Sequence, residues 1–185
     1  MKVEATKLKD CFIIHDTVFK DDRGYFFESF NQQKFASLTG LNVHFVQDNQ
    51  SKSTRGVLRG LHFQQGEHAQ AKLVRVLEGK VLDVAVDIRK DSPTFGEYVA
   101  VELTAENHIQ LFVPRGFAHG FVVLSDTATF FYKCDNFYNK ASEGGLIYND
   151  SAINIDWQIH QSEVLLSEKD AALPTLAECK DLIYF

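Results

Sequence analysis

The side chains best suited to chemistry in this chain are a few ionisable groups within strand-like segments. Arg59 and His62 lie three residues apart, and Lys72 follows ten residues after His62. Two later segments add His119 and Tyr132. An imidazole can take a proton near neutral pH, fixed cations stabilise developing negative charge, and a phenol can donate a proton. These residue types predict proton transfer beside a carbonyl group, without a metal or a cofactor.

Lys72 and Tyr132 each lie within an otherwise apolar run. At the period of two that is typical of strands, Lys72 shares a face with Val74, and Tyr132 shares a face with Phe130. If these faces point into a core, burial of a cation and a phenol without partners costs several kcal/mol, which indicates a functional site. The alternative is that both residues end their strands and extend their polar groups into solvent. The sequence leaves both interpretations open.

His62 is the candidate base. Positive charge on Arg59 and Lys72 would lower the pKa of His62 and keep the imidazole neutral, so that it can accept a proton. A carboxylate partner would have the opposite effect on the pKa and would fix the tautomer. Asp170 is one candidate for that partner, although the sequence does not place it there. A purely structural role for His62 is the alternative.

His119 ends the pattern Pro114-x-Gly116-x-x-His119, which resembles the second half of the cupin signature. In the first half, a metal site would require a second histidine two residues from His62, and Phe63-Gln64 follows instead. We therefore expect no metal, and His119 is expected to hydrogen-bond a ligand or to stabilise its own turn. A metal-dependent cupin remains the competing hypothesis.

Composition limits the class of protein. The chain has 185 residues with 45% hydrophobic residues, which predicts one globular domain over residues 1–185. A formal net charge of -6 disfavours nucleic acid as a partner but allows a small anionic ligand. No apolar run approaches the roughly 18 to 20 residues of a membrane span, and the first residues lack the apolar centre of a secretory signal. Three scattered cysteines, Cys11, Cys134 and Cys179, argue against disulfides and structural zinc, so we expect a cytoplasmic protein.

The fold class is predicted to be mainly β. Short apolar or alternating runs recur at intervals of 8–12 residues between turn residues, which is typical of an antiparallel sandwich or barrel. The expected strands include 81–88, 98–104, 109–113 and 121–124. Asn31 is expected to cap a helix over 32–38 that ends before Gly40, and Pro174 is expected to open a last short helix that extends to Asp181.

Ordered motifs over roughly residues 5 to 172 carry a family resemblance. They are Asp21-x-Arg23-Gly24-x-Phe26-x-Glu28, Gln47-Asp48-Asn49, Arg59-Gly60-Leu61-His62, Gln70-Ala71-Lys72, Gly116-Phe117-Ala118-His119, Tyr132-Lys133-Cys134, Glu143-Gly144-Gly145 and Ser167-x-Lys169-Asp170. On these motifs the chain resembles the dTDP-4-dehydrorhamnose 3,5-epimerase family of nucleotide-sugar enzymes. The resemblance implies a cupin-like jelly roll with short peripheral helices, no cofactor, a dTDP-sugar substrate and a homodimer in which the N-terminal strand crosses to the partner.

The same resemblance implies roles for individual residues. His62, supported by Asp170, would remove a proton beside the C4 ketone; Lys72 would stabilise the enolate oxygen. Tyr132 would return a proton from the opposite face, and Tyr138 would stack on thymine. The substrate-binding residues implied by the resemblance are Arg23, Glu28, Gln47, Asp48, Asn49, Arg59, His119, Tyr138, Glu143 and Lys169.

Several activities fit these groups. The expected reaction inverts C3 and C5 of dTDP-4-dehydro-6-deoxy-D-glucose to give dTDP-4-dehydro-L-rhamnose. A mono-epimerase acting at C3 or C5, or a keto-isomerase acting on a related dTDP-4-keto-6-deoxy sugar, would use similar groups. A cupin that binds a sugar or nucleotide without catalysis is the hypothesis from a different class.

Overall fold

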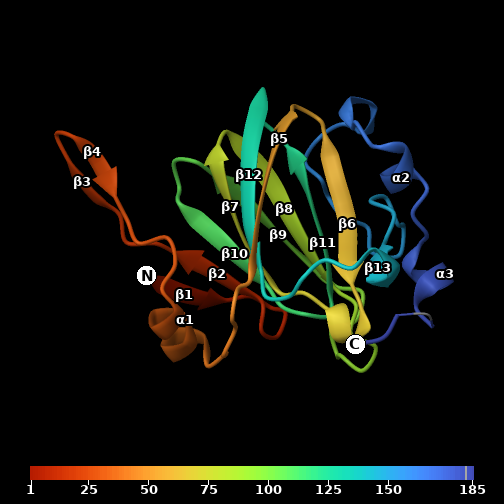
Figure 1. Ribbon diagram of the computed structural model, residues 1–185. Helices are drawn as coiled ribbons and strands as arrows, with labels where there is room; N and C mark the ends of the chain where they lie inside the picture. The colour runs from red at the N-terminus through yellow and green to blue at the C-terminus, as the bar shows by residue number, and fades with distance from the viewer. Residues whose placement is uncertain (182) are drawn as a thin grey trace.

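A computed structural model describes residues 1–181 and 183–185 of the chain and consists mostly of strands (Figure 1). The strands are β1 (Lys2–Ala5), β2 (Phe12–His15), β3 (Phe19–Asp21), β4 (Gly24–Phe26), β5 (Gln47–Thr54), β6 (Leu58–Gln64), β7 (Lys72–Glu78), β8 (Lys80–Asp87), β9 (Tyr98–Thr104), β10 (Ile109–Val113), β11 (Phe117–Val123), β12 (Thr127–Cys134) and β13 (Glu143–Gly145). The α-helices are α1 (Gln32–Thr39), α2 (Glu168–Ala171) and α3 (Leu176–Cys179), and 3-10 turns cover Gly66–His68, Lys140–Ser142 and Gln161–Glu163.

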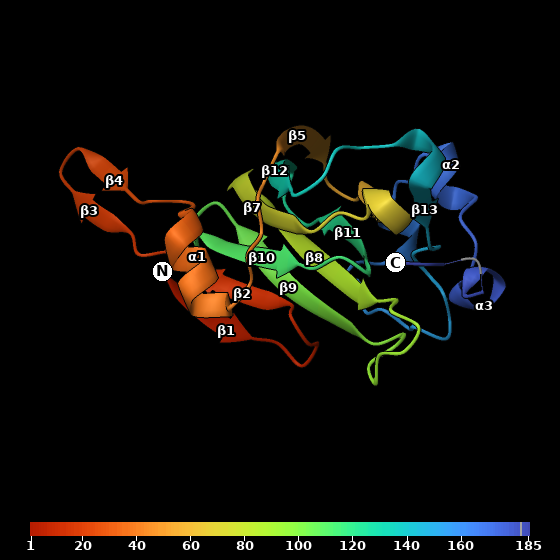
Figure 2. The same cartoon turned by 60° about the horizontal axis from the view of Figure 1, so that its bottom comes forward.

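Two antiparallel sheets form a sandwich. One sheet has the strand order β1-β2-β10-β7-β12-β5, and the other has the order β13-β6-β11-β8-β9. Strands that are distant in sequence are therefore neighbours in space, which is typical of a jelly roll. Figures 1 and 2 show the small hairpin of β3 and β4 projecting away from both sheets. The expected mainly β, cupin-like class is confirmed.

Strand β8 shows how the sequence builds the sandwich. Val81 and Ala85 pack inside it against residues of both sheets, whereas Leu82 and Val84 pack on the outer face beneath the C-terminal segment. Both faces of β8 are therefore covered, and all its apolar residues are buried. On the other sheet, α1 covers the outer face through the buried Phe35.

The helices follow their sequence signals, with one correction. Asn31 caps α1 by accepting from the backbone N–H of Lys34, and Gly40 ends α1 in the left-handed region at φ 74°. The last helix, α3, is shorter than expected at both ends. Thr175 caps it, so the helix begins after that residue rather than at Pro174, and it ends at Cys179 rather than at Asp181. Among the described residues, the helices are too short and too polar for any of them to cross a membrane.

β11 also differs from its predicted extent. It begins at Phe117, four residues before the expected start, and pairs with β8 along its whole length. Gly120 lies within this strand, and Gly116 directly precedes it. Because of this extension, His119 is part of β11 and faces the interior of the sandwich.

Asp87 holds the loop that follows β8. Its buried carboxylate accepts from Nε and Nη2 of Arg89 at 2.9 and 2.8 Å, and from the hydroxyls of Ser92 and Thr94 at 2.5 and 2.7 Å. Burial alone would raise the pKa of Asp87, but these hydrogen bonds outweigh it and hold the pKa below its ordinary value. A group with a depressed folded-state pKa stabilises the fold above the pKa of the unfolded chain, and that stability is lost as the pH falls through the folded-state value.

Asp87→Asn is therefore expected to lower the free energy of unfolding by roughly 2 to 3 kcal/mol at neutral pH, because it removes the charged acceptor of several hydrogen bonds. The difference from wild type should shrink in acid, where Asp87 is protonated in both states. Urea unfolding at neutral and acidic pH measures both effects, with the exposed Asp91→Asn as a control. Equal stability of Asp87→Asn and wild type at neutral pH would contradict this assignment.

Candidate active site

Three strands of one sheet direct their functional side chains into the sandwich. β12 pairs with β7 on one side and with β5 on the other, so inward residues line up in rows across the three strands. The rows are Lys72–Cys134–Gln47, Val74–Tyr132–Asn49 and Val76–Phe130–Ser51. Of the two interpretations that the sequence left open for Lys72 and Tyr132, the inward one is correct.

A bulge in the opposite sheet brings two more functional groups inward. His119 of β11 pairs with His62 of β6, and Phe121 pairs with Arg59, so two residues of β6 lie opposite Gly120 alone. Glycine is required there, because a Cβ on Gly120 would lie 2.7 Å from the carbonyl oxygen of Arg59. His62 and Arg59, three residues apart, therefore both face the other sheet.

The space between the sheets is a cavity with two adjoining lobes of about 290 Å³ each. Both lobes share the side chains of Asn49, His62, Lys72 and Tyr132. The first lobe is completed by Gln47, Phe63, Gln64, Gln70, Cys134, Tyr138 and Glu143. The second lobe is completed by Gln50, Ser51, Arg59, His119, Gly120, Phe121, Phe130 and Asp170.

His62 forms a hydrogen-bonded pair with Asp170. The distance from Nε2 of His62 to Oδ1 of Asp170 is 2.6 Å, and the carboxylate is buried. Asp170 is held in turn at the start of α2, where its backbone N–H donates to the hydroxyl of Ser167 at 3.1 Å. Because Nε2 donates to the carboxylate, Nδ1 of the neutral imidazole keeps the free lone pair.

The pKa of His62 is lowered, as expected, but mainly for a different reason. Burial is the largest cause; the charge of Lys72 adds a smaller effect, and Asp170 opposes both. Arg59, which we expected to contribute, is not among the principal causes. His62 is thus neutral near pH 7 and can accept a proton.

Lys72 and Tyr132 respond to the same burial in opposite ways. Loss of water lowers the pKa of Lys72, and it raises the pKa of Tyr132. The ammonium of Lys72 donates to the backbone carbonyl of His62 at 3.5 Å, so it lies beside the candidate base. The phenol of Tyr132 keeps its proton at neutral pH and can donate it.

A second histidine–carboxylate pair lines the second lobe. Nε2 of His119 lies 3.0 Å from each carboxylate oxygen of Asp83, and Asp83 is fully buried. Arg59 lines the same lobe, where its Nε donates to the hydroxyl of Ser53 at 3.1 Å. Asp83 lies within the expected strand 81–88, but the sequence did not reveal its link to His119.

The first lobe opens past a group of polar residues at its rim. The exposed Tyr138 donates its hydroxyl to Glu143 at 2.9 Å, and Lys169 pairs with the same carboxylate at 2.6 Å. Deeper in the lobe, Gln47 donates to Asn49 at 3.1 Å. These five residues of the predicted binding set therefore lie in or beside one lobe.

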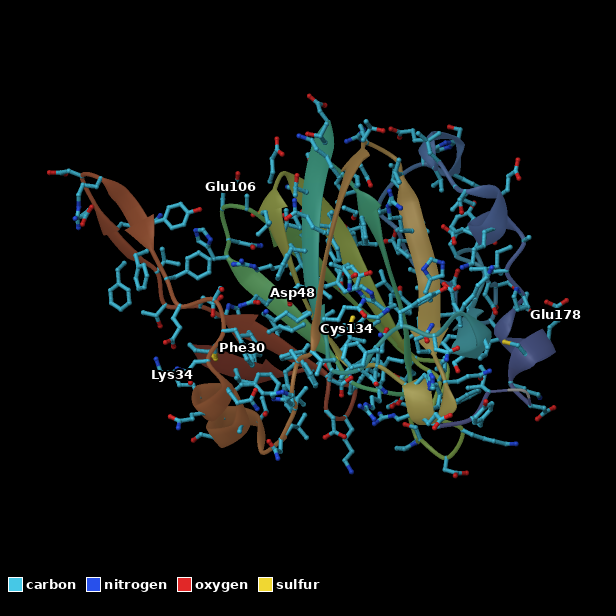
Figure 3. All side chains as sticks on the ribbon, viewed as in Figure 1. Phe30, Lys34, Asp48, Glu106, Cys134 and Glu178 are labelled. Atoms are coloured by element: carbon cyan, nitrogen blue, oxygen red, sulfur yellow. The ribbon has the colours of Figure 1, made fainter. Side chains whose placement is uncertain are left out.

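Four predicted binding residues do not line this cavity; one of them, Lys169, lies beside it and pairs with the lining Glu143. Asp48 alternates with Gln47 and Asn49 on β5, so it faces out of the sandwich and pairs with Lys133 at 2.9 Å. Figure 3 shows Asp48 and Cys134 near the middle of the molecule. Arg23, whose side chain is 90% exposed, pairs with Asp21 at the tip of the projecting hairpin.

Glu28 follows the same hairpin and pairs with Lys34 of α1 at 2.8 Å. Within a single copy of the chain, the segment that carries Arg23 and Glu28 is thus directed away from the cavity. Their sequence motif gave no sign of this, because a motif identifies residues without placing the hairpin that carries them.

Other lining residues were missed by sequence reasoning. Gln64, Gln70, Cys134, Phe121 and Phe130 all line one of the lobes. Cys134 and Phe130 have the same parity as Tyr132 on β12, and this signal could have identified them. Within residues 1–181 and 183–185, no three His, Cys, Asp or Glu side chains are grouped as metal ligands would be.

Comparisons with known proteins show which family the chain resembles. A family model described as dTDP-4-dehydrorhamnose 3,5-epimerase matches residues 5–178. The enzyme of that name from Salmonella typhimurium is 58% identical over 176 residues, which cover 95% of this chain and 96% of the relative.

Solved structures give the same result. The dTDP-4-dehydrorhamnose 3,5-epimerase from Elizabethkingia anophelis has 63% identity and a TM-score of 0.94, with 96% of this chain and 97% of that chain covered. The dTDP-6-deoxy-D-glucose-3,5-epimerase from Legionella pneumophila, solved in complex with dTDP-4-keto-L-rhamnose, has 46% identity and a TM-score of 0.94 over 99% of this chain and 97% of that chain. From its sequence, its sandwich and these relatives, the chain belongs to the dTDP-4-dehydrorhamnose 3,5-epimerase family.

Proposed function

We propose that this chain inverts C3 and C5 of dTDP-4-dehydro-6-deoxy-D-glucose to give dTDP-4-dehydro-L-rhamnose, by removing and returning protons through an enolate. One observation carries the proposal: His62 and Tyr132 extend from opposite sheets into one cavity that Lys72 also lines. Family membership supports the proposal, as does the keto sugar that the Legionella relative binds.

The C4 ketone explains why one site can act on two carbons. C3 and C5 both adjoin C4, so removal of either proton places negative charge on the same oxygen. The proton is weaker as an acid than imidazolium by on the order of ten pKa units, or about 14 kcal/mol. A positioned base contributes typically 10²–10⁴-fold, so the enolate oxygen must be stabilised as well. The buried ammonium of Lys72 provides that fixed charge.

Each inversion balances its protons as follows. Nδ1 of His62 takes the proton from carbon, and the electron pair of the C–H bond enters the enolate, whose oxygen lies beside Lys72. Tyr132 then donates its phenolic proton to the opposite face of the same carbon. His62 returns its proton to solvent, and Tyr132 regains one before the second inversion. Asp170 does not take the proton; it orients His62 and stabilises the imidazolium.

The remaining predicted residues are assigned to binding. Arg59 and His119 line the second lobe and are proposed to hold a phosphate or the sugar. Tyr138 is proposed to stack on thymine at the rim of the first lobe, where Glu143 and Lys169 are paired. Gln47 and Asn49 supply amide groups from β5. Asp48 faces away, and we propose that it only fixes the register of β5 through Lys133.

Arg23 and Glu28 require a second copy of the chain in this proposal. Their hairpin exposes Phe19 (63%), Tyr25 (61%) and Phe26 (70%), which is unusual for large apolar side chains in a folded protein. A homodimer in which the hairpin packs on the partner would cover these rings and bring Arg23 to the partner's diphosphate site. One domain over residues 1–185 and a cytoplasmic location complete the proposal; the three free, buried cysteines support a reducing compartment.

His62→Ala is expected to abolish proton exchange while leaving nucleotide binding intact, because His62 is the proposed base and not an anchor for dTDP. In D₂O the wild-type enzyme should incorporate deuterium at both C3 and C5, and the variant should lose roughly 10³-fold in rate at both carbons. NMR of the sugar measures the label, and calorimetry measures the affinity for dTDP. The exposed His44→Ala is the control. Label at a single carbon in wild type would indicate a mono-epimerase instead.

The pH profile should report the ionisation of His62. Because only neutral His62 accepts a proton and its pKa lies below the ordinary 6.5, kcat should rise through an acidic limb and be level at neutral pH. Asp170→Asn removes an anion that raises this pKa, so its acidic limb should move to lower pH and its plateau should fall. A shift of the limb to higher pH in that variant would refute the pairing.

Complementation tests the contribution of the second copy. Arg23→Ala alone should lower kcat/KM by roughly 100-fold through loss of a charged hydrogen bond to phosphate. In a one-to-one mixture of Arg23→Ala with His62→Ala, half of the dimers are hybrids, and one of the two sites in each hybrid is intact. About a quarter of wild-type activity should therefore return. His62→Ala mixed with Lys72→Met should stay inactive, because both changes affect the same cavity. No recovery in the first mixture would exclude an exchanged Arg23.

A further inference from the structure

Asp83 is a buried carboxylate to which the proposed reaction assigns no role. It lies on the inward face of β8 between Val81 and Ala85, both of which belong to the apolar interior, and it is fully buried. A carboxylate in such a place destabilises the fold by several kcal/mol unless it is paired. Asp83 does not line either lobe of the cavity, so it cannot contact the sugar directly.

Its hydrogen bonds are directed at the cavity wall. Both oxygens of Asp83 accept from Nε2 of His119, at 3.0 Å each. His119 is the cross-strand partner of His62, so the two histidines stand side by side in the second lobe. Each has its own carboxylate behind it: Asp170 behind His62 and Asp83 behind His119.

The same carboxylate acts on Lys72. Burial lowers the pKa of Lys72, and the charges of Asp83 and Glu143 oppose that decrease. Cys134 of β12 is the cross-strand partner of Lys72, Glu143 of β13 lines the same lobe, and the ammonium donates to the backbone carbonyl of His62 on β6. Asp83 is the fully buried carboxylate of the set, and its field is therefore the least screened by solvent.

We propose that Asp83 is a positioning residue of this site, whose buried carboxylate orients the imidazole of His119 beside the reacting sugar. The inference rests on the proposed epimerase function and adds a residue to it. The two histidine–carboxylate pairs then have different tasks: Asp170 orients the base, and Asp83 orients a histidine that binds the sugar. With Nε2–H of His119 donated to Asp83, Nδ1 is left to accept from a sugar hydroxyl.

Asp83→Asn tests this role, and Asp87→Asn is a matched control on the same strand and the same inward face. We expect kcat of Asp83→Asn to fall roughly 10- to 100-fold, with KM within about 3-fold of wild type. The alkaline limb of its kcat profile should move to lower pH, because Lys72 loses a neighbouring anion. Asp87→Asn, assayed below its unfolding temperature, should keep the wild-type kcat and alkaline limb.

A kcat of Asp83→Asn within about 3-fold of wild type would overturn the proposal. A loss of activity equal to that of Asp87→Asn would reduce Asp83 to a structural role. If Asp83→Asn does not fold, ¹⁵N NMR of the wild-type protein can measure the tautomer of His119 instead. His119 should carry its proton on Nε2, and an Nδ1–H tautomer would refute the assignment. Absence of deuterium exchange in wild type would refute the epimerase function, whereas the tautomer of His119 is measured independently of it.

Discussion

The site depends on polar groups held inside an apolar sandwich. Lys72 and Tyr132 lie on strands whose alternate residues fill the core, and their shifted pKa values both follow from loss of water. The same burial that makes these groups reactive also destabilises the fold, because a desolvated charge needs a partner. The buried carboxylates Asp170 and Asp83 have such partners in His62 and His119, and apolar packing on both faces of β8 offsets the remaining cost.

The period of two explains how much could be predicted from sequence. Alternation showed that Lys72 shares a face with Val74, and that Tyr132 shares a face with Phe130. It left open whether those faces point inward, and the structure shows that they do. The extents of β9 and β10 were predicted for the same reason, and α1 followed from its cap at Asn31. Such signals are local in the chain.

The rest could not be predicted, because it depends on contacts between distant segments. His62 and Asp170 are 108 positions apart, and Asp170 lies on a helix of four residues. β5 is polar on both faces, so no hydrophobic pattern sets its register; only its pairing with β12 shows that Asp48 faces outward. The link from Asp83 to His119 likewise needs the alignment of β8 with β11.

Lys72 requires burial and Arg23 does not, and this difference explains why the proposed site can be shared between two chains. Groups that need a shifted pKa must be buried, and burial is achieved within one sandwich, so His62, Lys72 and Tyr132 come from a single chain. A guanidinium needs no such burial, because it stays charged in water and binds phosphate through directed hydrogen bonds. Arg23 can therefore be carried on an exposed hairpin outside the core. In the proposed dimer, the proton chemistry belongs to one chain, and only the hold on the diphosphate is shared with its partner.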